Sequence, residues 1–80
     1  MESRWVVFSW TREGKPMQWY KNLKGKGRGI VAKAGGEYFW SIELENGRGI
    51  LSFVVDSGFE GTSKDAKRRV EEVFELVEEL

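Results

Sequence analysis

The sequence contains neither cysteine nor histidine. Their absence excludes disulfides, thiolate or imidazole metal sites, and catalysis by a cysteine nucleophile or a histidine base. The carboxylates outside the C-terminal segment, such as Glu43, Asp56 and Glu60, are scattered, and their spacing indicates no pair of a nucleophile and a base. We therefore expect a protein that is not an enzyme and that needs no metal ion and no small-molecule cofactor.

Long apolar runs are missing as well. No segment approaches the length of about 18 apolar residues that a membrane span requires, and no apolar run follows a basic N-terminal region. We therefore expect no membrane contact, no signal peptide and a cytoplasmic location. Asparagine, glutamine and methionine are scarce while 32% of the residues are charged, a composition that favours a thermophile protein.

Acidic residues are absent between Glu13 and Glu37. Residues 1–36 hold eight Lys/Arg against two Glu, which is a net charge of +6, and residues 37–80 hold five Lys/Arg against eleven Asp/Glu, which is −6. The neutral total therefore conceals a strong charge dipole. Such asymmetry between the halves of a chain points to nucleic-acid or membrane contact.

The first 56 residues are rich in strand-forming residues, with residues typical of turns between them. Glu13-Gly14, Gly35-Gly36 and Asn46-Gly47 are each typical of a hairpin turn. They predict an antiparallel meander of five strands within residues 4–56, of which four can be bounded as Arg4–Trp10, Met17–Tyr20, Ile30–Ala34 and Tyr38–Leu44. Whether this sheet curls toward a barrel is left open by the pattern.

The turns also predict a register. Around Glu13-Gly14, Phe8 should face Trp19, and around Asn46-Gly47, Trp40 should face Phe53 and Ile42 should face Leu51. These pairings place one apolar set on a first face: Val6, Phe8, Trp10, Met17, Trp19, Tyr38, Trp40, Ile42, Leu44, Leu51, Phe53 and Val55. A second set lies on the opposite face: Trp5, Val7, Tyr20, Phe39, Ile50 and Val54.

The C-terminal segment has the pattern of an amphipathic helix over about residues 63–80. Thr62 is a good N-cap with Asp65 three residues on, and an apolar stripe runs from Ala66 to Leu80 at helical spacing. Residues 1–80 are thus predicted to form a single α+β domain. One helix covers one face of the sheet, so the second face must line a barrel, pack on another subunit or meet a ligand.

The basic segment that follows Glu13 is interleaved with aromatic residues, the combination that single-stranded nucleic acid requires. Cations neutralise phosphates and aromatic rings stack on unpaired bases without reading sequence. The candidate stacking residues are Trp5, Trp19, Tyr20 and Phe39, and the candidate phosphate contacts are Lys21, Lys24, Lys26, Arg28 and Lys33. We predict binding of single-stranded DNA or RNA with little sequence preference. The glycines between Lys24 and Ile30 lie between two strands, so they do not match a phosphate loop.

Two families share this character. Five strands, a final helix and a basic glycine-rich segment resemble the Sul7-type chromatin proteins, which are strongly basic, whereas this chain is neutral. Trp5, Trp19, Tyr20 and Phe39, together with the five cations named above, resemble more closely the ThermoDBP-related single-stranded nucleic-acid-binding proteins of hyperthermophilic archaea. That resemblance implies an apolar aromatic cleft flanked by basic residues in an oligomer.

Other interpretations remain open. The aromatic residues could be core, and the basic segment could be a solvated loop. The segregated charges also fit a protein-interaction or oligomerisation module. We expect a homodimer or tetramer, because the chain is short and its second apolar face exceeds what one helix can cover.

Overall fold

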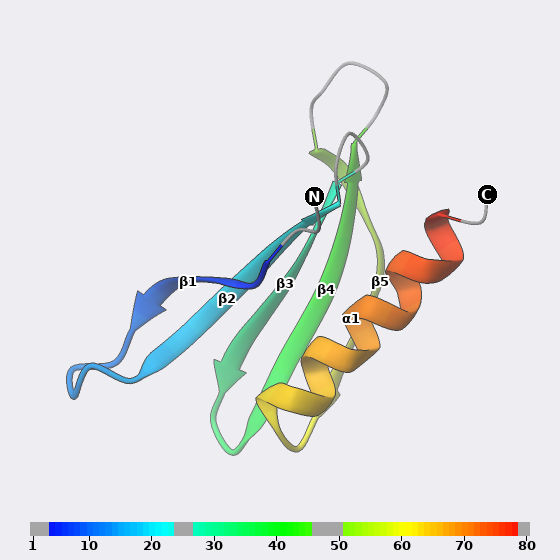
Figure 1. The fold of residues 1–80 in the computed structure, drawn as a ribbon. Helices are drawn as coiled ribbons and strands as arrows, with labels where there is room; N and C mark the ends of the chain where they lie inside the picture. The colour runs from blue at the N-terminus through cyan, green and yellow to red at the C-terminus, as the bar shows by residue number, and fades with distance from the viewer. Residues whose placement is uncertain (1–3, 24–26, 46–50, 79–80) are drawn as a thin grey trace.

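The computed structural model describes residues 4–23, 27–45 and 51–78 (Figure 1). An antiparallel sheet with strands in sequence order is followed by one helix, as predicted. The elements are β1 Val6–Trp10, β2 Pro16–Leu23, β3 Gly27–Ala34, β4 Glu37–Glu45, β5 Leu51–Glu60 and α1 Ser63–Glu78. The sheet is open and does not close into a barrel: β1 and β5 are its two edges.

Helix α1 packs across β3, β4 and β5 on one face of the sheet (Figure 1). The core between these layers combines sheet and helix residues: Trp19, Leu23, Val31, Trp40, Ile42, Ala66, Val70 and Phe74. The amide of Asp65 donates to Thr62 Oγ1 at 3.1 Å, so the predicted N-cap is confirmed. The predicted stripe is confirmed at Ala66, Val70 and Phe74, whereas Leu80 lies outside the described residues.

Strand β3 begins at Gly27, three residues before the predicted start at Ile30. The glycine-rich segment is therefore partly strand, and Gly29 lies directly beneath α1. A Cβ atom at Gly29 would overlap the Cγ1 atom of Val70 and press on the ring of Phe74. Glycine lets α1 pack directly on the backbone of β3.

The predicted register of the first hairpin is wrong by one residue. Val7, not Phe8, pairs with Trp19, and the connection is a longer turn in which the Thr11 amide donates to the Lys15 carbonyl at 2.8 Å. Register irregularities follow Val7 and Ser9. Because a one-residue slip exchanges the two faces of a strand, Val6 and Phe8 lie on the face away from α1, and Trp5 and Val7 pack against the core.

Of the other two predicted hairpins, one agrees with the structure and one has a different register. The Gly35-Gly36 turn is confirmed, with Ala34 paired to Glu37 and Gly35 at a φ of 64°. Asn46-Gly47 lies outside the described residues, but the register predicted around it is wrong: Trp40 pairs with Gly58 rather than Phe53. Register irregularities after Ile42 and Leu44 shift the strand. A Cβ atom at position 58 would lie 3.0 Å from the Trp40 indole, so this large ring favours glycine opposite it.

Candidate nucleic-acid interface

The face of the sheet opposite α1, here called the open face, is covered by none of the described residues (Figure 1). Pairing partners in an antiparallel sheet point to the same side, and side chains alternate along each strand. The register therefore places one apolar set together on the open face: Val6, Phe8, Tyr20, Ile30, Phe39, Val54 and Phe59. A contiguous, exposed apolar surface on a small domain marks a site of interaction.

Four rings on the open face form two pairs. The centroids of Phe8 and Tyr20 lie 5.6 Å apart with the planes tilted by 57°, and those of Phe39 and Phe59 lie 5.2 Å apart with a tilt of 59°. Phe8 is 45% exposed and Phe59 is 55% exposed, while Tyr20 and Phe39 are half-buried. Each pair thus combines an anchored ring with one that is accessible to a flat partner.

Charge divides the sheet into two halves. The charged residues within β1–β3 are Lys21, Arg28 and Lys33, whereas those within β4 and β5 are Glu37, Glu43, Glu45, Asp56 and Glu60. Because the strands lie in sequence order, the dipole of the sequence becomes a basic half, β1–β3, beside an acidic half, β4–β5. Arg28 Nε donates to Glu43 Oε2 at 3.1 Å across the boundary between the two halves.

The predicted stacking residues separate onto two faces. Tyr20 and Phe39 lie on the open face. Trp19 belongs to the core and is only 8% exposed, and Trp5 lies half-buried on the same covered face. Trp19 lies on the first face, as predicted, whereas the corrected register moves Trp5 from the second face to the covered one. Neither tryptophan therefore belongs to the interface on the open face.

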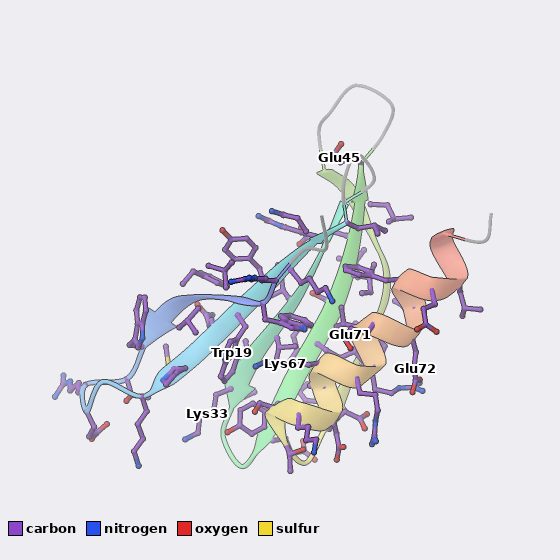
Figure 2. The ribbon with its side chains drawn as sticks, in the orientation of Figure 1. Trp19, Lys33, Glu45, Lys67, Glu71 and Glu72 are labelled. Atoms are coloured by element: carbon purple, nitrogen blue, oxygen red, sulfur yellow. The ribbon has the colours of Figure 1, made fainter. Side chains whose placement is uncertain are left out.

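Both tryptophans instead belong to a cluster that joins the start of the chain to α1, here called the Glu71 cluster (Figure 2). Glu71 Oε1 accepts from Trp5 Nε1 at 2.9 Å and from Lys21 Nζ at 3.1 Å. The Lys67 ammonium lies 4.7 Å from the ring centroid of Trp19 and 5.8 Å from that of Trp5. This geometry is a cation–π contact shared by two rings.

The environment of the Glu71 cluster shifts two pKa values. The hydrogen bond from Trp5 lowers the pKa of Glu71 against the opposing effect of burial, and Lys21 and Lys67 lower it further. Burial lowers the pKa of Lys67, while the charge of Glu71 partly restores it. Lys21 is thereby engaged inside the protein, on the face away from the two ring pairs.

The predicted phosphate contacts also divide. Lys33 is exposed near the end of β3 (Figure 2), whereas Lys21 and Arg28 are held in ion pairs. Lys24 and Lys26 lie outside the described residues. Sequence reasoning did not select Phe8, Phe59, Arg12 or Lys15 for this surface. The strand that holds Phe8 is visible in the sequence, but the face on which Phe8 lies depends on the register, which the turn residues did not predict correctly.

Comparison with protein-family models, with curated proteins and with solved structures found no match. Among the described residues, α1 is too short and too polar to cross a membrane. Nor do those residues bring three carboxylates together in a group that could hold a metal ion. The chemistry of the interface is therefore argued from the open face and its charges.

Proposed function

We propose that this protein binds single-stranded nucleic acid on the open face, by base stacking on aromatic rings and phosphate contacts from basic residues, with little sequence preference. The observation that carries the proposal is the uncovered sheet face with its two ring pairs beside a basic set of strands. No fixed array of hydrogen-bonding groups is needed for this binding mode, since every base has a π-face.

The polar residues of the open face support the same function. Gln18 and Asn22 lie on the open face beside the rings, and Arg28 lies on the same face. Neutral amides can satisfy base edges at little desolvation cost, and Arg28 can exchange Glu43 for a phosphate. The surface is thus amphipathic, as a single strand with apolar bases and a charged backbone requires.

A fluorescence titration with oligothymidylate of about 20 nucleotides tests the proposal. We expect binding whose logarithmic affinity falls linearly with the logarithm of salt concentration. Replacing Tyr20 by alanine should cost about 1–3 kcal/mol of binding free energy and keep the salt slope, because a stacking ring carries no charge.

Leu76→Ala is the matched control, since Leu76 is 64% exposed on α1 and away from the open face. It should bind like the parent protein. A parent protein that shows no binding at low salt would exclude the proposed function. If Tyr20→Ala binds as tightly as the parent protein, Tyr20 does not stack on a base.

A second candidate function is self-association. Val6, Phe8, Val54 and Phe59 are each between 42% and 55% exposed on the open face, and an apolar surface of this kind can pack against a second copy. The acidic half of one copy could then face the basic half of another. In this alternative the protein is an oligomerisation or protein-interaction module, and it self-associates without binding an oligonucleotide.

A further inference from the structure

The two ring pairs of the open face lie in opposite electrostatic surroundings. Phe8 and Tyr20 belong to β1 and β2 in the basic half, whereas Phe39 and Phe59 belong to β4 and β5 in the acidic half. We infer that the nucleic acid follows the basic half and that its bases stack on Phe8 and Tyr20 rather than on Phe39 and Phe59. This inference rests on the proposed function and specifies which part of the open face binds the nucleic acid.

Exposure alone would favour the other pair. Phe59 is 55% exposed and Phe8 is 45% exposed, and the ring separations of 5.2 Å and 5.6 Å are nearly equal. The difference between the pairs is charge: by the register, the charged residues that β4 places on the open face are the carboxylates Glu37, Glu43 and Glu45, whereas the one that β2 and β3 place there is Arg28. Like charges repel each other, and neutralising phosphates requires cations. Charge therefore decides between two otherwise similar stacking sites.

Two exposed cations, Arg12 and Lys15, lie in the turn between β1 and β2. Lys33 is exposed as well, but it pairs with Tyr38, which packs against Trp19, so the register places Lys33 on the side of α1 and not on the open face. Neither Arg12 nor Lys15 makes an ion pair with another described residue.

These cations are available to phosphates without the loss of an internal contact, unlike Lys21 and Arg28, each of which contacts a carboxylate at 3.1 Å. Glu13 reduces the net charge of the turn to +1 but leaves it positive. The β1–β2 turn thus supplies cations that can contact the phosphates of a strand whose bases stack on Phe8 and Tyr20.

The first experiment compares Phe8→Ala with Phe59→Ala in titrations with the same oligothymidylate. Each variant removes one exposed phenyl ring of one pair on an edge strand, so the two changes are closely matched. We expect Phe8→Ala to weaken binding by about 5-fold to 150-fold and Phe59→Ala to leave the dissociation constant unchanged within error. Phe8→Tyr keeps the ring and should bind like the parent, which separates stacking from folding.

The outcomes distinguish this inference from the proposed function. If the parent binds and Phe59→Ala weakens binding as much as Phe8→Ala or more, the inference is wrong and the proposed function stands. If the parent does not bind, the proposed function itself is wrong. Failure of Phe8→Tyr to bind would also contradict the inference, because the stacking ring is retained.

A second experiment tests the cations through the salt dependence. Lys15→Ala should lower the salt slope by about 0.7, the value for one phosphate contact on a single strand. Lys64→Ala is the control, because Lys64 is an exposed lysine on α1 without an ion pair to the described residues, and its slope should equal that of the parent. If Lys15→Ala and the parent have equal salt slopes, the phosphate backbone of the oligonucleotide does not contact Lys15 in the β1–β2 turn.

Discussion

Glu71 joins parts of the chain that are far apart in the sequence. Its single Oε1 atom accepts from Trp5 and Lys21, which are separated from it by 66 and 50 positions in the sequence. The helix is thereby joined to the segment before β1 and to β2, the part of the sheet that its apolar stripe covers least. The hydrogen bonds of Glu71 thus connect α1 to the β1–β2 side of the sheet, where the helix makes fewer apolar contacts.

Protonation of Glu71 should weaken this contact. The folded-state pKa of Glu71 lies below its ordinary value of 4.5, so the unfolded chain binds the proton more readily. The stabilisation is therefore fully present above the ordinary pKa and is lost as the pH falls through the folded-state pKa. In Glu71→Gln this part of the acid sensitivity should disappear, which urea unfolding at neutral pH and at about pH 3 would measure.

Glu72→Gln is the control for that experiment. Glu72 is half-exposed and, among the described residues, pairs only with Arg69, three residues away on the same helix, at 2.9 Å. Its removal should change the free energy of unfolding by less than about 1 kcal/mol, with the acid sensitivity of the parent retained. An acid response of Glu71→Gln equal to that of Glu72→Gln would contradict the role given to Glu71.

At the scale of elements, the position of α1 on the sheet depends on Gly29. Val70 is fully buried and its side chain is stiff, so an added methyl group at Gly29 displaces the helix or the strand. Gly29→Ala should reduce the free energy of unfolding by about 1–3 kcal/mol, measured by urea denaturation.

Gly36→Ala is the matched substitution in the turn between β3 and β4. No atom lies within 4 Å of a Cβ at Gly36, and its φ is not positive. This variant should be neutral or more stable by up to about 1 kcal/mol, because alanine restricts the unfolded chain. A stability of Gly29→Ala equal to the parent would mean that α1 does not pack on β3 as closely as described.

At the scale of the whole molecule, the uncovered apolar face and the two charged halves predict self-association. We expect sedimentation at high micromolar concentration to report a homodimer or tetramer rather than the 9.2 kDa monomer. Because such a contact uses the basic half that also attracts phosphates, added oligothymidylate should shift the oligomer toward smaller species. A 9.2 kDa species at all concentrations would contradict this prediction and leave the open face to the nucleic acid alone.

Elements that depend on short-range signals could be predicted from the residues alone. Thr62 starts α1 because its hydroxyl satisfies an amide three residues on, and Gly35-Gly36 turns the chain because glycine accepts a positive φ. The division into a basic and an acidic half was also predictable, since a meander keeps neighbours in sequence adjacent in space. Strand order and charge are thus properties of the chain that folding preserves.

Which rings face outward depends on the three-dimensional packing and could not be predicted from the residues alone. Irregularities in β1 and β5 shift the register, and a shift of one residue moves Phe8 from the expected core to the open face and Trp5 from the expected surface to Glu71. In β5 the shift brings Gly58 opposite Trp40, a long-range contact that no local pattern encodes. The identity of the candidate stacking residues therefore follows from packing, because the two faces of a strand differ by a single step in register.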